Sequence, residues 1–229
     1  MAHLGTLLAG FAHEVRNPLS TIGLNLQLVL EDFREAESTR DKRTKKRLST
    51  VEGEVRRLQA ILEEFLSYAR APEPKVTLEP LNQKLQALID FQDLEMKEAN
   101  LSLRFYPGAD VDKVACDWDH LQAAVVNLVR NAKDATPSGG QIFVSTQRDG
   151  DFVTINVTDT GAGIPEQEID RVLEPYFSTK KGGTGLGLPT VRRVAEDHDG
   201  SLTMQSEPGK GTQFSLRLPV RGSESSAET

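Results

Sequence analysis

The chain has 229 residues, of which 38% are hydrophobic and 27% charged, and this ordinary globular composition excludes collagen-like, disulfide-rich and wholly disordered proteins. The net charge of −7 argues against wrapping nucleic acid or binding a membrane through a basic surface, so an anionic ligand must find local cations. A single cysteine, Cys116, and the lack of an apolar run of about 18 residues predict a cytoplasmic protein, although a longer parent protein could be attached to a membrane.

Apolar residues recur every three or four positions over residues 4–33 and again over residues 48–69, which predicts two amphipathic helices joined by a polar link at residues 35–46. The second repeat is regular enough to be a coiled-coil seam. We expect the basic run at residues 42–47 to lie in the solvated loop of this hairpin. Because two helices alone leave an apolar flank exposed, we expect two copies to form a homodimeric four-helix bundle.

Pro72 and Pro74 interrupt the helical period, so we place a domain boundary there. The expected domains are residues 1–71 and 72–220, followed by a disordered polar tail at 221–229. In the second domain, helices are predicted at residues 80–99, 119–135 and 186–198. Strands are predicted at residues 101–106, 141–148, 152–159, 201–206 and 213–218, and the last four of these form two hairpins.

His13 lies between two apolar seam positions, Phe11 and Val15, so we expect its imidazole to point away from the hairpin core, where it can react. Glu14 follows it directly, and Asn17 lies one turn later on the same face. A lone histidine in such a place is usually a solvated surface residue. Only the neighbours of His13 favour chemistry.

A second polar cluster lies on a predicted helix. Asn127 and Asn131 are four residues apart, so their amides share one face, with Arg130 and Asp134 close by. Polar groups on a mostly apolar helix need partners, and a ligand is one such partner. An ordinary helix exterior before a turn is the alternative.

A third cluster begins where a predicted strand ends at Asp159 and turns on Gly161 and Gly163. We expect these glycines to let a flat ligand approach the backbone while the Asp159 carboxylate accepts a hydrogen bond from an amino group of that ligand. Further on, a glycine-rich loop at residues 182–188 runs into a helix start, which presents backbone amides to phosphates, and Lys180 supplies positive charge.

Over about residues 4–219, these segments together closely resemble the catalytic core of a two-component sensor histidine kinase. The H, N, G1, F and G2 boxes of that family resemble residues 13–19, 127–134, 159–163, 176–177 and 183–187. The resemblance implies an α plus α/β fold. An antiparallel helical hairpin that forms a dimeric four-helix bundle would be followed by an α/β sandwich of the Bergerat ATP-binding type.

The resemblance implies ATP and Mg²⁺ as cofactors. Asp159 would bind the adenine amino group, and Asn131 would hold Mg²⁺ against the triphosphate. Lys133 and Lys180 would contact phosphates, with Arg130 as a further candidate, under a mobile lid at residues 165–184. The nucleotide-binding residues that it implies are Asn127, Arg130, Asn131, Lys133, Asp134, Asp159, Gly161, Gly163, Ile164, Phe177, Thr179, Lys180, Gly183, Thr184, Gly185, Leu186, Gly187 and Leu188.

The resemblance also implies that His13 is the nucleophile that ATP phosphorylates, with Glu14 as the base. The phosphoryl group would then pass to an aspartate on the receiver domain of a response regulator. Asn17 would orient a water molecule for the dephosphorylation of that regulator.

Two other functions remain open on the same nucleotide fold. One is an ATP-driven clamp or hydrolase, and the other is a pseudokinase scaffold that binds ATP without transferring phosphate. Clamp relatives place a water-activating glutamate four residues before the metal-binding asparagine, where this sequence has Asn127. Outside the motifs, we expect His120 and His198 to be surface or helix-capping residues and Cys116 to be a small buried apolar residue.

Overall fold

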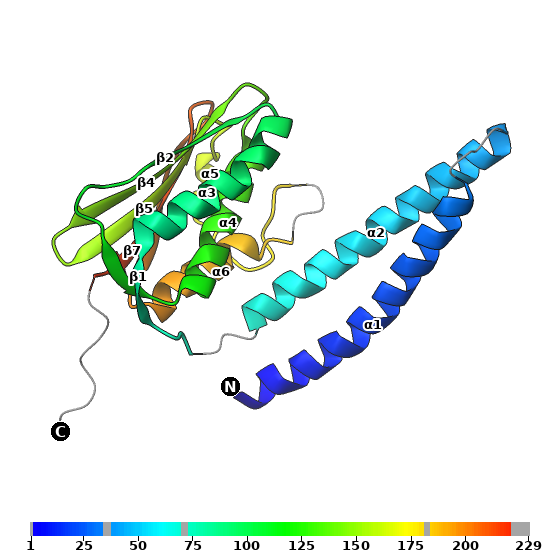
Figure 1. The fold of residues 1–229 in the computed structure, drawn as a ribbon, viewed down its shortest axis with the longest axis horizontal. Helices are drawn as coiled ribbons and strands as arrows, with labels where there is room; N and C mark the ends of the chain where they lie inside the picture. The colour runs from blue at the N-terminus through cyan, green and yellow to red at the C-terminus, as the bar shows by residue number, and fades with distance from the viewer. Residues whose placement is uncertain (1, 34–37, 70–72, 181–183, 221–229) are drawn as a thin grey trace. The chain divides into compact units, whose positions relative to one another are not determined.

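The computed structural model describes residues 2–33, 38–69, 73–180 and 184–220. For residues 2–14, 16, 60 and 63–69 it describes the helical backbone and not the side chains. The chain forms two compact units, Met1–Ala71 and Pro72–Thr229 (Figure 1).

The first unit is a hairpin of two long helices, α1 (Ala2–Asp32) and α2 (Thr39–Ala69), as the apolar repeats predicted (Figure 1). Gln59 Nε2 donates a 3.4 Å hydrogen bond to Ser20 Oγ, and a Cβ built on Gly23 would lie 3.7 Å from Val55. From the first pair to the second, the residue number rises in α1 and falls in α2, so the two helices are antiparallel. Val55 is buried in the seam between them.

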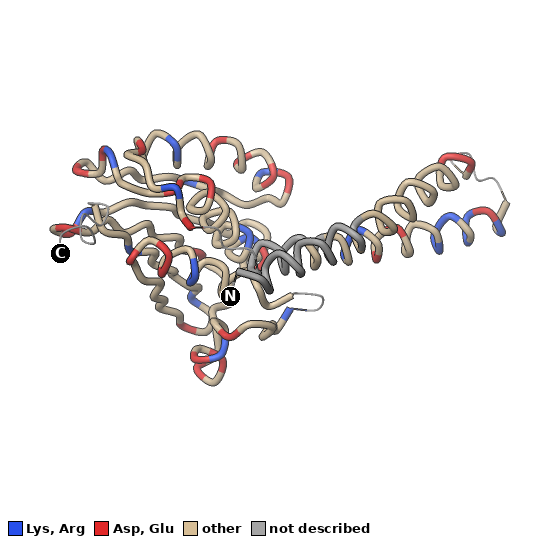
Figure 2. Tube along the Cα trace, turned by 90° about the horizontal axis from the view of Figure 1, so that it is seen from below, with Lys and Arg blue, Asp and Glu red and all other residues tan. Residues whose placement is uncertain are grey.

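The second helix begins earlier than predicted, and the basic run at residues 42–47 is therefore helical and not a loop. Ser38 Oγ accepts a 3.1 Å hydrogen bond from the Asp41 N–H, the capping arrangement that starts a helix. Lysine and arginine form helices well but give no apolar repeat. A prediction from apolar periodicity therefore placed the start of α2 too late. Figure 2 shows basic residues gathered along these first turns of α2.

The second unit is a five-stranded sheet with helices packed on one face (Figure 1). Its strands are β2 (Ser102–Tyr106), β4 (Gln141–Asp149), β5 (Phe152–Asp159), β6 (Ser201–Glu207) and β7 (Gly211–Pro219). Their order is β2-β4-β5-β7-β6, with β2 parallel to β4 and all other neighbours antiparallel. The helices are α3 (Leu81–Glu98), α4 (Trp118–Ala135), the short α5 (Glu166–Ile169) and α6 (Gly187–Asp197). The predicted α/β sandwich with two β-hairpins is confirmed.

The core lies between the sheet and the three long helices. Val153, Ile155 and Val157 of β5 are buried in alternation with less buried neighbours, because successive side chains of a strand point to opposite faces. Leu128 of α4 and Val191 of α6 are fully buried against them in the same cluster. This core fixes the end of β5 and the two helices on which the polar motifs lie.

A second sheet was not predicted. β1 (Thr77–Pro80) pairs antiparallel with β3 (Lys113–Cys116). Each strand has four residues, which is too short for an alternating pattern to be recognised. Cys116 at the end of β3 is buried, as expected, and this burial raises the pKa of its thiol to about 11. No helix in the described ranges combines the length and the apolar character that crossing a membrane requires.

Candidate functional site

Asp159 is the last residue of β5 and is buried, with 4% of its surface exposed. Its Oδ1 accepts hydrogen bonds from the Gly161 N–H at 2.8 Å and the Thr212 N–H at 3.3 Å. Within the described part of the chain, its other oxygen, Oδ2, accepts no hydrogen bond. The carboxylate is thus fixed through one oxygen and offers the other to a donor on a ligand.

Burial raises the pKa of Asp159 above its ordinary value of 3.8. The hydrogen bonds from Gly161 and Thr212 and the positive charge of Lys180 act in the opposite direction but do not offset the burial. A buried carboxylate that has lost its hydrating water is stabilised when a hydrogen-bond donor reaches it. The electrostatics of Asp159 therefore favour a ligand that brings an N–H group.

Gly161 and Gly163 are required by the packing of the protein's own backbone. A Cβ on Gly161 would lie 2.4 Å from the carbonyl oxygen of Ala135, and one on Gly163, where φ is +69°, would lie 2.2 Å from that of Glu207. The Ala162 N–H also donates to Ala135 O at 3.1 Å. The sequence predicts that these glycines admit a ligand, whereas in the structure Gly161 lets the loop pack against the end of α4 and Gly163 lets it pack against the end of β6.

The start of α6 lies against the two asparagines of α4. A Cβ built on Gly187, the first residue of α6, would lie 3.7 Å from Asn127 Oδ1 and 3.8 Å from Asn131 Nδ2. Both asparagines are partly buried. The polar face of α4 thus meets a helix N-terminus, where backbone amides and the helix dipole favour an anion.

The loop before α6 is tied to the aromatic pair of the predicted F box. The Tyr176 N–H donates a 3.0 Å hydrogen bond to Gly185 O. A Cβ on Gly185, where φ is +69°, would lie 2.6 Å from the Phe177 nitrogen, so only glycine fits. The guanidinium of Arg171 lies 4.2 Å from the centre of the Phe177 ring. These contacts bring residues 176–177 to the glycine-rich loop.

Lys180 reaches the same asparagine face. Its Nζ donates to Asn131 Oδ1 at 3.2 Å and pairs with Asp134 Oδ2 at 2.9 Å. The predicted residues Lys180, Asn131 and Asp134 therefore meet at one point. Because Ala135 holds the Gly161 loop one residue further on, the C-terminal turns of α4 connect Asp159 with Lys180.

Other predicted nucleotide-binding residues are placed differently. Lys133 does not lie with Lys180, because its Nζ pairs with Glu95 of α3 at 2.5 Å. Arg130 and Thr179 are exposed. Ile164 and Thr184 are partly buried, as is Leu188, whereas Leu186 is buried. Gly183 lies outside the described residues.

The predicted phosphorylation motif lies on α1. The side chains of His13 and Glu14 lie outside the described ones, and their backbone is helical. Asn17 is exposed, and its carbonyl oxygen accepts a 3.1 Å hydrogen bond from Thr21 Oγ1. Pro18 lies inside α1, which continues past it.

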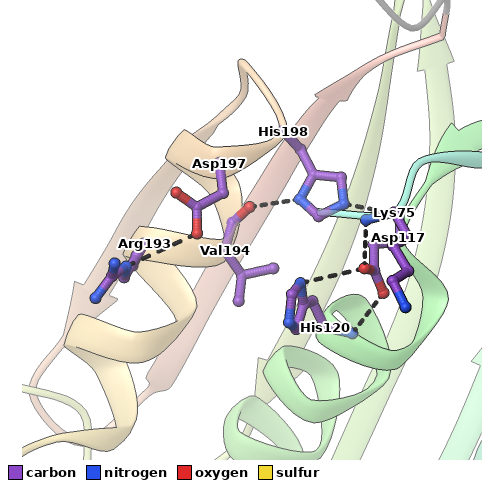
Figure 3. A network of polar contacts seen from close by, with 7 residues as sticks. All are labelled: Lys75, Asp117, His120, Arg193, Val194, Asp197 and His198. Atoms are coloured by element: carbon purple, nitrogen blue, oxygen red, sulfur yellow. Dashed lines mark hydrogen bonds and ion pairs between the residues drawn. The ribbon is translucent and has the colours of Figure 1, made fainter. Parts of the chain in front are cut away.

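Sequence reasoning missed two groups. Thr212, whose N–H donates to Asp159, also has its hydroxyl oxygen 2.8 Å from that of Ser206. Ser206 Oγ in turn accepts from the Ile164 N–H at 2.8 Å. The glycine at position 211, where φ is +108°, was the available signal for a close approach to the Asp159 backbone. Of the two roles expected for His198, the structure shows the helix cap: His198 is the C-cap of α6 and is buried at 6% exposure beside Asp117, and this contact was not predicted (Figure 3).

Two family models match the chain. Residues 3–74 match the His Kinase A (phospho-acceptor) domain, and residues 116–222 match the histidine kinase-, DNA gyrase B-, and HSP90-like ATPase. Sporulation kinase E of Bacillus subtilis is 32% identical over 95% of this chain, and sensor histidine kinase ZraS of Escherichia coli is 32% identical over 95%. The chain spans 29% and 46% of the lengths of these relatives.

Solved structures also resemble nearly the whole chain, among them two histidine kinases. Histidine kinase ThkA in complex with response regulator protein TrrA has a TM-score of 0.68 and 25% identity, covering 96% of this chain and 63% of that chain. Full-length ShkA in complex with AMPPNP has a TM-score of 0.76 and 23% identity, covering 96% of this chain and 47% of that chain, and shows the shared fold. Taken with the family models and the curated relatives, these matches show that the chain belongs to the two-component sensor histidine kinases, of which it is a catalytic core.

Proposed function

We propose that this chain transfers the γ-phosphoryl group of ATP to His13 and then to an aspartate of a response-regulator receiver domain. Residues 1–71 would dimerise and carry the phosphorylated histidine, and residues 72–220 would bind ATP. The observation that carries the proposal is the buried carboxylate of Asp159, which two backbone amides hold by one oxygen. The match to an ATPase-like family model supports an adenine nucleotide at this carboxylate.

In this proposal the adenine amino group donates to Asp159 Oδ2. The phosphates lie along the segment from Gly185 to Leu188, where the amides at the start of α6 neutralise part of their charge. Lys180 adds a cation at this end, since its Nζ already lies at the asparagine face. The ammonium of Lys133 is paired with Glu95, so Lys133 would have to leave this partner to contact a phosphate.

The residues at the end of α4 fit a magnesium ion. Asn131 Oδ1 and Asp134 Oδ2 both accept from the ammonium of Lys180, so the two oxygens face one cation. They would hold Mg²⁺ instead once Lys180 turned to a phosphate oxygen. An amide oxygen and a carboxylate oxygen are ligands that Mg²⁺ accepts together with water and phosphate oxygens. When bound there with ATP, the metal would neutralise charge on the transferring phosphoryl group.

The chemical step would be an in-line attack by a neutral ring nitrogen of His13 on the γ-phosphorus. A nitrogen–phosphorus bond forms, the bond from the γ-phosphorus to the bridging oxygen breaks, and ADP leaves with that oxygen. Glu14 takes the ring proton or holds the opposite ring nitrogen, a contribution of about 10²–10⁴-fold in rate. Transfer to a regulator aspartate regenerates the free histidine.

A homodimer is supported by the apolar seam of the hairpin. Ile22 and Val29 of α1 and Val51 and Leu58 of α2 belong to the predicted seam and yet are 40–50% exposed. A second hairpin that covers them would complete a four-helix bundle. The phospho-acceptor family model over residues 3–74 supports this arrangement, and the complex of ThkA with a response regulator supports a receiver-domain partner.

The first test incubates the purified chain with γ-labelled ATP and Mg²⁺ and follows protein-bound label before and after mild acid. A phosphohistidine is acid-labile, so we expect label that acid releases and that His13→Gln abolishes. ATP binding or steady hydrolysis without protein-bound label would instead favour the scaffold or the clamp.

A second test addresses the metal assignment. Asn131→Asp places a second carboxylate beside Asp134 and removes the neutral amide, so we expect loss of productive Mg-ATP use. Size-exclusion chromatography should show an unchanged dimer. Normal phosphorylation in this variant would contradict the assignment of Asn131.

We also propose that Asn17 supports dephosphorylation of the partner regulator. It is exposed and lies one turn after His13, where its amide can orient a water molecule. Asn17→Ala should keep phosphorylation of His13 and lose the phosphatase reaction on a phosphorylated regulator. An unchanged phosphatase rate would refute this role.

A further inference from the structure

Helices α4 and α6 pack side by side in opposite directions. At one end, Asp117, the N-cap of α4, contacts His198, the C-cap of α6. At the other end, Gly187 lies against Asn131 of α4. The nucleotide site proposed above therefore lies at one end of this helix pair, and a buried polar junction lies at the other.

The junction depends on the two ring nitrogens of His198. Nε2 accepts a 2.9 Å hydrogen bond from the backbone N–H of Asp117, and Nδ1 lies 2.7 Å from Val194 O (Figure 3). Because an amide can only donate and a carbonyl can only accept, the imidazole is neutral with its proton on Nδ1. The ring is buried, so both bonds are formed without competition from water.

The same junction receives the start of the second unit. The Lys75 N–H donates a 2.7 Å hydrogen bond to Asp117 Oδ2, and the His120 N–H donates to Oδ1 at 3.2 Å (Figure 3). Lys75 follows the Pro72–Pro74 segment at the boundary between the two units. Asp117 thus joins the incoming chain, the start of α4 and the end of α6.

We propose that His198 is a positioning residue for the nucleotide site. Its bond to Asp117 sets how far α6 extends along α4, and so where Gly187 and the amides after it face Asn127 and Asn131. An α-helix of 11 residues is a rigid rod, so a displacement at His198 is passed to Gly187. This inference rests on the proposed function, because it concerns the binding of the same nucleotide.

The test compares His198→Gln with His198→Leu in the full chain. The glutamine can still accept from the Asp117 N–H, whereas leucine leaves that buried donor without a partner. Affinity for ADP with Mg²⁺ is measured by calorimetry at a temperature where circular dichroism shows every variant folded. We expect about a tenfold loss for leucine and a much smaller loss for glutamine. Glu196→Gln, which breaks only an exposed pair with Arg192, is the matched control.

Equal affinities in folded wild type, His198→Gln and His198→Leu would overturn the proposal, as would a loss of stability without a loss of affinity. Failure of the wild type to bind ADP would instead contradict the proposed function.

If His198→Leu does not fold, His198→Ala takes its place, because alanine also lacks an acceptor for the Asp117 N–H. Equal affinities for ADP in the folded wild type, His198→Gln and His198→Ala would overturn the proposal.

Discussion

In the described part of the hairpin, Val55 is the one buried hydrophobic side chain, whereas the second unit buries a continuous core between its sheet and three helices. The exposed apolar residues of the hairpin are Ile22, Leu24, Leu28, Val29, Val51 and Leu58. Two packed helices can cover only one stripe of each other, while a sheet covered by helices closes its own core. The described side chains of the hairpin thus leave apolar surface that a second copy would cover, whereas the second unit buries its own core.

This difference matters for the two sites. The nucleotide site needs atoms held to a fraction of an ångström, and it is built where β5, α4 and α6 share one core. The histidine that we propose is phosphorylated would need access to ATP and then to a second protein, and it lies on the long helix α1. A self-contained core suits the first task, and an elongated, associating surface suits the second.

The largest expected effect is in the core of the second unit. Leu128 is fully buried, so Leu128→Ala should lower the free energy of unfolding of this unit by about 2–5 kcal/mol. Leu94→Ala on α3, where the leucine is 69% exposed, is the control and should change it by less than about 0.5 kcal/mol. Urea unfolding followed by Trp118 fluorescence measures both, and the loss should not depend on protein concentration.

In the hairpin, we expect substitutions of exposed seam residues to weaken dimerisation. Val51→Gln with Leu58→Gln places polar groups on the exposed seam, and should raise the dissociation constant of the dimer at least about a hundredfold. Leu24→Gln with Leu28→Gln changes residues of similar exposure that lie outside the seam, and should leave the dimer intact. Sedimentation equilibrium distinguishes them, and equal effects of the two pairs would refute the predicted dimer interface.

Substitutions of one glycine in each unit should change stability in opposite directions. Gly161→Ala would put a Cβ 2.4 Å from the Ala135 carbonyl and should destabilise the second unit by about 1–3 kcal/mol. Gly53 lies inside α2 with nothing within 4 Å of its position for a Cβ, so Gly53→Ala should stabilise the hairpin by about 0.5–1 kcal/mol. Thermal unfolding checks both signs, and destabilisation by Gly53→Ala would show a contact that the isolated hairpin lacks.

The sequence predicted the elements whose pattern repeats over many residues. The long helices and both β-hairpins of the second unit carry such periods, whereas the four-residue strands β1 and β3 do not. The start of α2 was misplaced because a serine cap and charged helix formers begin it without any apolar residue.

In the site, the motifs identified Asp159, Asn131 and Lys180, whose chemistry is visible in the residue type and its spacing. The pairing of Lys133 with Glu95 and the burial of His198 could not be predicted, because each partner lies far away in the sequence. Such contacts depend on how α3, α4 and α6 pack, which a local pattern does not record.

The smallest expected effect is on the pH dependence of stability, through the buried carboxylate of Asp159. Burial raises the pKa of this carboxyl in the folded protein, so the folded state binds the proton more tightly than the unfolded chain does. The resulting stabilisation is complete below the ordinary value of 3.8 and is lost as the pH rises through the raised pKa. Asp159→Asn keeps an oxygen for the amides of Gly161 and Thr212 and carries no charge.

The variant should therefore gain stability relative to the wild type as the pH rises from about 4 to 7, while its affinity for ATP falls. Urea unfolding at several pH values, with ATP binding measured at pH 7, checks both parts. A stability difference that does not change with pH would show that the hydrogen bonds from Gly161 and Thr212 offset the burial of Asp159. Burial would then leave no unfavourable charge at Asp159 for a ligand to relieve, and a preference of this site for a donor ligand would need another source.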